Sequence, residues 1–420
     1  MRISMVTSGS RGDVQPLVVL ADELRRRGHD IVLGVPPNIV NLGERAGLTT
    51  RAVGPDTQEF LVSTQGQRYL ASGNVAAFTK ALGAVIHDNA ALLDSNTREV
   101  CTDADIIVAG SLGEHRAACV AEARGIPLVC VHYVPVRPTR AYPNMLVTTR
   151  SLPGAVNLAT HALFQRMYWR SMREDINRFR GQLGLPAATA STATRLAAAG
   201  TLELQAYHAA LVPALTDYPA QRPIIGFPVV GPDLRERLGE TGGDPELDGW
   251  LADGEPPAYF GFGSMPVIDP DATMGMISRV ADRLGMRALV GSGWSALAAP
   301  RGADDRIKVS RGVLNYDEVL PRCAVAVHHG GAGTVAAGVA AGIPTVVCSV
   351  VADNPFWGAR IQELELGAHE RFATLTDDRL EAAVGRALRP RVIERSRELG
   401  RVLRSDTDAA RRGVDLIEAG

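Results

Sequence analysis

A strand, a glycine-rich turn and a helix follow one another at the beginning of the chain, and another strand comes next. Residues 2–7 are mostly apolar, residues 8–13 (SGSRGD) are polar and glycine-rich, and apolar side chains recur at helical spacing through residues 14–27. Gly28 ends that helix, and residues 31–35 form the next apolar run. Such a succession within about thirty-five residues is typical of a βα unit in a parallel sheet. The pattern therefore predicts an α/β fold.

The same succession returns in the second half of the chain, after a stretch in which helical periodicity stops. That stretch, residues 212–244, holds five prolines and several glycines, which favour turns. A chain of 420 residues is also longer than one hydrophobic core usually organises. We therefore expect two Rossmann-like, doubly wound domains with parallel sheets. The expected divisions are residues 1–215 for the N-terminal domain, 216–244 for a linker, 245–395 for the C-terminal domain, and 396–420 for a helical tail that packs back toward the N-terminal domain.

Further apolar runs and helical periods predict the other elements. The expected strands are residues 105–109, 127–133, 257–261, 288–291, 307–310, 324–327 and 345–351. The expected helices are residues 114–124, 156–184, 271–284, 335–341 and 375–389. Two segments, residues 56–89 and 135–152, lack clear periodicity, and we interpret them as insertions at the open end of the sheet, where loops carry function.

The composition is that of a globular protein with no overall preference for a charged partner. Hydrophobic residues make up 46% and the formal net charge is −2, so neither nucleic acid nor an anionic membrane is expected to attract the whole chain. No apolar run is long enough to span a membrane, and residues 3–7 are too short for a secretory leader. The five cysteines lack metal-ligand spacing, so we expect buried thiols in a cytoplasmic protein without integral membrane contact.

Residues 328–334 (HHGGAGT) lie where a predicted strand turns into a predicted helix. The first N–H groups of a helix have no internal partner and carry partial positive charge, and glycines let the backbone come close to an anion. A histidine and a threonine beside such a loop can donate further hydrogen bonds to phosphate oxygens. The loop is therefore interpreted as a phosphate site, and a tight strand-to-helix turn is the structural alternative.

Three further sites follow predicted strands. Asp353 and Asn354 can together accept and donate hydrogen bonds, which suits a vicinal diol; the alternative is a helix N-cap before Pro355. Asp13 follows the first strand and can take a proton from an incoming hydroxyl, with helix capping as its alternative. Ser264 suits either phosphate binding or a turn.

With these residues assembled, the chain resembles the GT-B glycosyltransferases, and more narrowly the family-1 enzymes that use nucleotide sugars. Within these it is most similar to bacterial natural-product glycosyltransferases of the vancomycin and macrolide types, and to sterol glucosyltransferases. The segments that carry the resemblance are residues 9–16 (GSRGDVQP), 260–265 (FGFGSM), 328–334 (HHGGAGT), 342–347 (GIPTVV) and 353–361 (DNPFWGARI). The resemblance implies two domains that face each other across a cleft.

The resemblance also implies roles for single residues. His329 falls on the histidine that hydrogen-bonds the diphosphate, Asp353 on the acid that holds sugar hydroxyls, and Asp13 on the general base. Val313 and Leu314 fall where the family grips the nucleotide base, largely through main chain. With Asp13 as the catalytic residue, the expected donor-binding residues are Ser10, Arg11, Gly12, Ser264, Val313, Leu314, His329, Gly331, Ala332, Gly333, Thr334, Asp353 and Asn354.

Three positions depart from the family pattern. Asn354 stands where glutamine is usual, and its side chain is one methylene shorter. Ala337 stands where plant enzymes use glutamate to hold ribose, which fits bacterial enzymes that accept thymidine diphosphate sugars. Val313 replaces the plant tryptophan that stacks on the base.

The activity that the resemblance implies is an inverting hexosyl transfer that needs no metal or other cofactor. The donor is a TDP- or UDP-sugar, and the acceptor is a hydroxyl of a lipophilic natural product such as a polyketide, macrolide, polyphenol or sterol. A nucleotide-sugar epimerase or hydrolase of the same fold stays open, as does a non-catalytic auxiliary protein, although the intact donor signature argues against the latter. We expect a monomer or homodimer. The expected acceptor-binding residues are Phe60, Tyr69, Phe78, His132, Tyr142 and Met145.

Overall fold

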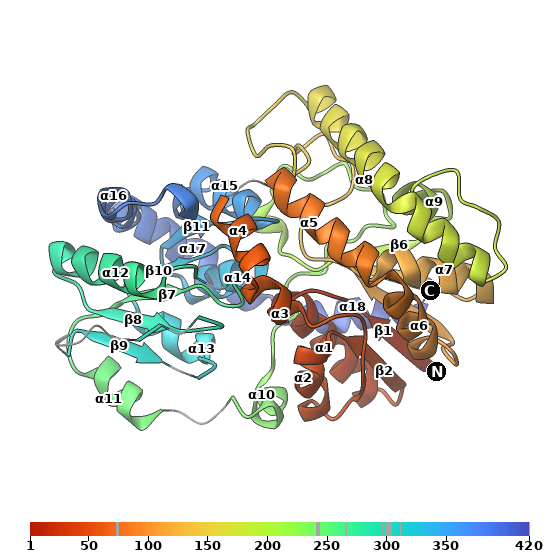
Figure 1. Ribbon diagram of the computed structural model, residues 1–420. Helices are drawn as coiled ribbons and strands as arrows, with labels where there is room; N and C mark the ends of the chain where they lie inside the picture. Colours follow the sequence, from red (N-terminus) through yellow and green to blue (C-terminus); the bar gives the residue numbers. More distant parts are fainter. Residues whose placement is uncertain are drawn as a thin grey trace. The chain divides into compact units, whose positions relative to one another are not determined.

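The computed structural model describes residues 1–72, 75–240, 244–265, 267–295, 297–298, 305–310 and 312–419. The chain forms two compact units, each built on its own six-stranded sheet (Figure 1). The first unit comprises Met1–Glu59, Ala76–Leu238 and Thr407–Gly420, and the second comprises Phe60–Val75 and Gly239–Asp406. Both sheets are parallel and doubly wound, which confirms the predicted α/β class.

The sheet of the first unit contains β1 (Arg2–Val6), β2 (Asp30–Val35), β3 (Thr49–Ala52), β4 (Ile106–Gly110), β5 (Leu128–His132) and β6 (Leu202–Gln205). The strands pair in parallel in the order β3-β2-β1-β4-β5-β6. The central strands β1 and β4 are mostly apolar and almost entirely buried because helices cover both faces of a parallel sheet. The strand order reverses direction between β1 and β4, and sheets of this kind bind ligands there, at the carboxyl ends of the strands.

The sheet of the second unit contains β7 (Ala258–Gly261), β8 (Ala288–Gly291), β9 (Ile307–Ser310), β10 (Val325–His328), β11 (Thr345–Ser349) and β12 (Gly367–Arg371). Its order, β12-β11-β10-β7-β8-β9, repeats that of the first sheet when its strands are numbered from β7. The reversal therefore falls between β7 and β10, and both strands end in loops that the sequence marks with glycine.

The helices of the first unit pack their apolar stripes onto its sheet. The long helix α8 buries Met172, Ile176 and Phe179 in a core that includes Val6 and Ile107. The helices of this unit are α1 (Arg11–Arg26), α2 (Val40–Arg45), α5 (Val75–Asp88), α6 (Ala90–Val100), α7 (Glu114–Arg124), α8 (Gly154–Gln182), α9 (Thr192–Ala198), α10 (Pro232–Leu238) and α18 (Ala409–Ala419), and α3 (Thr57–Val62) begins in this unit.

The helices of the second unit enclose two apolar clusters, one that contains Phe260 and Val327 and one that contains Tyr259 and Leu289. The alternation of neighbouring residues between clusters reflects the period of two along a strand. The helices are α4 (Thr64–Ser72), α11 (Pro245–Ala252), α12 (Pro270–Leu284), α13 (Tyr316–Val319), α14 (Ala332–Ala341), α15 (Asn354–Glu363), α16 (Asp377–Ala387) and α17 (Pro390–Ser405).

The segment 56–89 differs from its expected irregular structure, because α3, α4 and α5 occupy most of it. Its glycines misled the interpretation. Gly66 lies inside α4. A Cβ at this position would lie 2.1 Å from the Phe60 carbonyl oxygen, so glycine is needed here for close packing and does not indicate a loop.

The division of the chain also differs from the expected one. Most of the expected linker, residues 216–244, belongs to the first unit, where Ile224 bridges to Gln205 beside β6 and α10 follows. The expected tail, residues 396–420, is divided between α17 in the second unit and α18 in the first. Among the helices of the described residues, none combines the length and the apolar character that crossing a bilayer requires.

Candidate active site

Asp13 lies in the first turn of α1, directly after the loop that leaves β1. Its Oδ2 accepts a hydrogen bond of 2.8 Å from the Ser10 backbone N–H, and Ser10 Oγ accepts one of 3.3 Å from Gly12 N. These contacts form a capping box, so the capping alternative describes what the side chain does locally. Gly9, at φ +110°, makes the arrangement possible, because a Cβ there would lie 2.3 Å from Asp13 Oδ2.

Burial raises the pKa of Asp13 to about 6, although the hydrogen bonds from Ser10 act in the opposite direction. The carboxyl is therefore mostly ionised at neutral pH and is more basic than an ordinary aspartate. A proton acceptor whose pKa lies near the working pH is well matched to general-base chemistry. The neighbouring Arg11 turns its guanidinium to Gln15, to which Arg11 Nε donates at 2.9 Å, and Gly12 is exposed.

Tyr133, which follows β5, adds a polar atom that the sequence gave no reason to single out. Its hydroxyl is buried without a hydrogen-bond partner, and it lies 3.3 Å from where a Cβ of Gly110 would stand. Burial raises the pKa of this hydroxyl well above its usual range, and the negative charge of Asp13 adds to the shift. Tyr133, after β5, thus lies close enough to Asp13, after β1, for the charge of the carboxylate to act on its hydroxyl.

His132, expected to contact an acceptor, is instead fully buried in a cluster of charged side chains. Its Nε2 lies 3.0 Å from Glu114 Oε2, and Arg137 Nη2 donates to the same oxygen at 2.8 Å. Arg137 also pairs with Glu203. The ring therefore belongs to the interior of the first unit, and its position at the end of a strand was a misleading signal.

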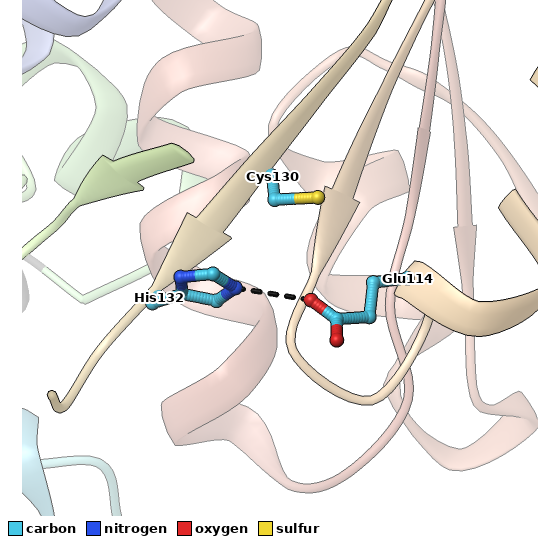
Figure 2. A group of neighbouring side chains, drawn as sticks. All are labelled: Glu114, Cys130 and His132. Atoms are coloured by element: carbon cyan, nitrogen blue, oxygen red, sulfur yellow. Dashed lines mark hydrogen bonds and ion pairs between the residues drawn. The ribbon is translucent and has the colours of Figure 1, made fainter. Parts of the chain in front are cut away.

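Figure 2 shows Glu114, Cys130 and His132, the one group in the described part of the chain whose spacing suits a metal ion. Arg137 Nη2 lies 2.8 Å from Glu114 Oε2 and 3.4 Å from His132 Nε2, so a guanidinium already provides the positive charge at these ligand atoms. Burial also raises the pKa of the Cys130 thiol well above its usual range, which disfavours the thiolate that metals bind. The cluster fits an ion-pair network better than a metal site.

The other expected acceptor residues differ in burial. Tyr142 is buried, and its hydroxyl accepts a hydrogen bond of 3.3 Å from Ala214 N, which is a structural contact. Phe60 and Met145 are half-buried. The side chains of Tyr69 and Phe78 lie outside the described residues.

The glycine loop of the second unit connects β10 to α14. Gly331 is the N-cap of α14, and no side chain caps the helix, so the N–H groups of Ala332, Gly333 and Thr334 lack a side-chain acceptor. Gly330 has φ +95°, and a Cβ there would lie 2.5 Å from Val347 Cγ1. The loop therefore requires glycine where it turns, and it leaves the positive end of α14 open to an anion.

The His329 ring is held between two glycines from different loops. A Cβ at Gly263 would lie 3.0 Å from its Cε1, and a Cβ at Gly331 would lie 2.6 Å from its Nε2. Burial lowers the pKa of His329 to about 4, so the ring is neutral at pH 7. Its Nδ1 is buried without a hydrogen bond of ordinary geometry, although a weaker interaction with the Gly261 backbone acts to raise the pKa of the ring. The loops after β7 and β10 thus meet at the point where the strand order reverses, around one imidazole.

His328 has a different role from its neighbour. It is fully buried, and its Nδ1 accepts a hydrogen bond of 3.0 Å from the N–H of Gly330, which fixes the turn. Burial lowers the pKa of His328 to about 3, so Nδ1 stays free to accept. The sequence could not distinguish the two histidines by spacing alone.

Asp353 and Asn354 lie at the start of α15. Asp353 Oδ2 accepts from Trp357 Nε1, and its Oδ1 accepts from Asn354 Nδ2, both at 3.1 Å. Asn354 is 4% exposed, and its Oδ1 accepts a 3.4 Å hydrogen bond from Val351 N. Asp353 is half-exposed and is the N-cap residue, but its side chain does not cap the helix. The carboxylate is thus held in place by Trp357, whereas the amide of Asn354 is used within the turn.

The remaining expected donor residues are described by their burial and by the loops and helices that hold them. Ser264 is half-buried directly after Gly263, in the loop that meets His329. Val313 is 60% exposed, whereas Leu314 packs against the apolar cluster of Tyr259. Thr334 is half-buried in the first turn of α14.

Comparison with known proteins identifies two family domains in the chain. The chain matches the glycosyltransferase family 28 N-terminal domain over residues 3–143. It matches the erythromycin biosynthesis protein CIII-like, C-terminal domain over residues 305–409. Each match falls in a different one of the expected halves.

Relatives align over nearly the whole chain. An uncharacterized glycosyltransferase of Mycobacterium leprae is 35% identical over 100% of this chain and 96% of its own length. The O-mycaminosyltylonolide 6-deoxyallosyltransferase of Streptomyces fradiae is 32% identical over 99% of this chain and 95% of its own length.

Solved structures share the fold. The glycosyltransferase of kitacinnamycin superposes with a TM-score of 0.73 at 22% identity, and covers 100% of this chain and 98% of its own. The glycosyltransferase VinC, solved in complex with dTDP, superposes with a TM-score of 0.66 at 16% identity, and covers 100% and 99%. The resemblance read from the sequence is confirmed, and the chain belongs to the GT-B glycosyltransferases of the natural-product type.

Proposed function

We propose that this glycosyltransferase is an inverting, metal-independent enzyme that transfers a hexose or deoxyhexose from a TDP- or UDP-sugar to a hydroxyl of a lipophilic acceptor. The observation that carries the proposal is the position of the neutral His329 ring, which packs between Gly263 and Gly331. The ring lies beside the N-terminus of α14, which no side chain caps. This arrangement offers backbone N–H groups and a buried imidazole nitrogen to one anion, which suits a diphosphate.

In the proposed reaction the acceptor oxygen forms a bond to the anomeric carbon of the sugar while the bond from that carbon to the diphosphate oxygen breaks. The acceptor proton goes to the carboxylate of Asp13. The leaving diphosphate gains negative charge, which the N–H groups of residues 332–334 and His329 stabilise, with Ser264 beside them. A single displacement from the face opposite the leaving group inverts the anomeric centre.

The donor and acceptor classes rest on relatives and on composition. The Streptomyces fradiae relative is named for transfer of a 6-deoxyallosyl group and for an O-mycaminosyltylonolide substrate, and VinC was solved with dTDP. These support a deoxyhexose donor and a polyketide or macrolide acceptor. Asp353, which Trp357 and Asn354 orient, is the residue proposed to hold the sugar hydroxyls.

The test is acceptor-dependent release of nucleoside diphosphate from a panel of TDP- and UDP-sugars, with and without chelator. We expect release only with acceptor present, unchanged by the chelator, and a product whose anomeric configuration by NMR is opposite to that of the donor. Release without an acceptor would instead support an epimerase or hydrolase. Retention of configuration, or loss of activity on chelation, would contradict the mechanism.

Calorimetry of TDP and UDP binding tests the donor site itself. We expect binding by the wild-type chain and clearly weaker binding by His329→Ala. An unchanged affinity would remove His329 from the site, and no nucleotide binding at all would favour an auxiliary protein.

A further inference from the structure

One stretch of the first unit contains basic residues and no acidic ones. Residues 123–173 contain seven arginines and no aspartate or glutamate, although the whole chain has a net charge of −2. Two of the seven are used internally, since Arg137 pairs with Glu114 and Arg124 donates to the Cys101 carbonyl at 2.7 Å. Because charges in water are screened beyond about 10 Å, a partner responds to this local excess and not to the net charge.

Four of the exposed arginines lie on α8 or shortly before it. They are Arg150, which precedes α8, and Arg166, Arg170 and Arg173 on α8 itself. Within the residues that the structure describes, none of the four forms an ion pair. Elsewhere the exposed arginines commonly find carboxylates, as Arg279 does with Asp377.

The same half of α8 exposes an apolar stripe. Val156, Leu163 and Met167 are 44%, 53% and 63% exposed. They stand at i, i+7 and i+11, which places them on one face of the helix. His161 and Met172 are buried on the opposite side, so the orientation of the helix is fixed by packing and the exposed stripe is not a result of fraying. Thr160 lies on the same face as the stripe and is buried there, where its Oγ1 accepts a hydrogen bond of 2.8 Å from Asn144 N.

The helix runs along the outside of the first unit, in yellow in Figure 1. Val147, in the loop that precedes it, is another exposed apolar side chain, at 42%. Single exposed aliphatic residues are ordinary on protein surfaces. A row of large exposed aliphatic side chains beside unpaired arginines, with no acidic residue from Arg166 to Arg173, indicates a surface that binds a partner.

We propose that the segment from Val147 to Arg173 docks the protein on an anionic lipid bilayer, with α8 lying on the membrane surface. Arginine heads pair with lipid phosphates while their alkyl stems and the Val156, Leu163 and Met167 side chains enter the boundary between headgroups and acyl chains. The inference does not depend on the proposed reaction, although it would place the enzyme where lipophilic acceptors dissolve.

A bilayer fits this surface better than the other occupants. In a two-fold dimer each surface meets its own copy, which would bring the unpaired arginines of the two copies together. A helix that carries Arg166, Arg170 and Arg173 is too polar to cross the bilayer, so the expected contact is with its surface. An acidic protein partner would match the charge, and the experiment below distinguishes it.

The experiment is co-sedimentation of the full chain with vesicles of pure phosphatidylcholine and with vesicles that also contain phosphatidylglycerol. We expect binding to the mixed vesicles only, and release of the protein as salt is raised. The test variant combines Leu163→Ser with Arg166→Gln, and the matched control combines Val402→Ser with Arg401→Gln on α17, where both side chains are also exposed. Each variant removes one exposed apolar side chain and one charge.

The α8 variant should lose most of its vesicle binding, several-fold more than the control, while both keep the wild-type circular dichroism spectrum. The triple variant Arg166→Gln, Arg170→Gln, Arg173→Gln should abolish the preference for anionic lipid. Equal binding to both kinds of vesicle, equal loss in test and control, or no vesicle binding by the wild-type chain would each overturn the proposal. In the last case capture of an acidic protein through the same arginines would identify the other kind of partner.

Discussion

At the scale of single residues, Asp13 is the proposed general base. Asp13→Asn keeps the size of the side chain and an oxygen that can accept from Ser10 N, but it removes the proton acceptor. We expect turnover to fall by roughly 10²–10⁴-fold, the usual contribution of a general base, with an unchanged Kd for the nucleoside diphosphate. Steady-state kinetics together with calorimetry would check both halves, and wild-type turnover in this variant would remove Asp13 from the mechanism.

The pH dependence follows from the pKa of Asp13, which burial raises to about 6. If Asp13 is the proposed base, it is protonated as the pH falls through this value, so kcat/KM should decrease below about pH 6. Stability should move the other way: the folded state binds the proton more tightly than an unfolded chain with a pKa of about 4, so this residue's contribution increases as the pH falls from about 6 to 4. A pH–rate profile whose limb lies near pH 4 would contradict the effect of burial.

Variants of His328 test whether the shape of the glycine loop, apart from any direct contact with the donor, affects donor binding. His328→Asn places an oxygen close to where Nδ1 now accepts from Gly330 N, whereas His328→Leu leaves that buried N–H without a partner. Losing the partner of a buried donor costs about 1–3 kcal/mol, so we expect the leucine variant to raise the donor KM by roughly tenfold or more. The asparagine variant should recover most of the loss, with little change in kcat. Equal defects in both variants would indicate a packing role only.

Residue types predict a donor site but not the contacts between its residues. The HHGGAGT sequence predicted the phosphate loop because helix ends and glycine have consistent physical properties. That Gly263 comes from another loop to face His329, or that Tyr133 turns an unpartnered hydroxyl toward the interior near Gly110, depends on how distant strands stack. No local pattern records such a contact, and His132 was misassigned for the same reason.

At the scale of elements, the loops after β7 and β10 together fix the position of the His329 ring. Gly331→Ala would place a Cβ within 2.6 Å of the His329 ring and push it toward Gly263. We expect the affinity for nucleoside diphosphate to fall at least several-fold with only a small change in Tm. Gly385→Ala in α16 is the matched control, since nothing lies within 4 Å of a Cβ there, and it should leave binding unchanged. Equal affinities of the two variants would show that the ring position is unimportant.

Three of the strands that sequence patterns missed lie at the edges of the sheets. The strands β3, β6 and β12 were not predicted, and each lies at the edge of its sheet. Edge strands are less buried than central ones: β3 reads TTRA and β12 reads GAHER, and both include exposed residues. The period of buried apolar side chains is the signal that predicts a strand, and it is weak in β3 and β12. It does not account for β6, which is mostly buried and was missed, or for the edge strand β9, which was predicted.

At the scale of the whole molecule, α18 holds the first unit together from the far end of the sequence. Val414 and Ile417 are fully buried, and Arg27 Nη1 donates to Asp415 at 2.6 Å and to Glu418 at 2.7 Å. Deleting residues 407–420 would expose their binding face on α1, at a cost of roughly 3–6 kcal/mol from the two aliphatic side chains alone. Thermal unfolding should show a lower Tm for the truncated chain. A deletion variant with the wild-type Tm would show that α1 does not need this cover.

The domain division could be predicted only in outline. Length and the proline-rich stretch gave two units, but Ile224 joins the first unit through a single bridge to Gln205, which leaves no periodic signal. The predicted tail was also helical, yet the position where the chain passes from one unit to the other, between Asp406 and Thr407, depends on which surface accepts α18.

The placement of α18 sets an order of events during synthesis. A ribosome makes residues 1–238 of the first unit early, then all of residues 239–406, and only afterwards the helix that covers Leu20 and Ile225 through Gly413. The part of the protein that is translated first is therefore completed last. Until α18 arrives, the nascent chain exposes an apolar strip of α1 that chaperones recognise, whereas the second unit can close while translation continues.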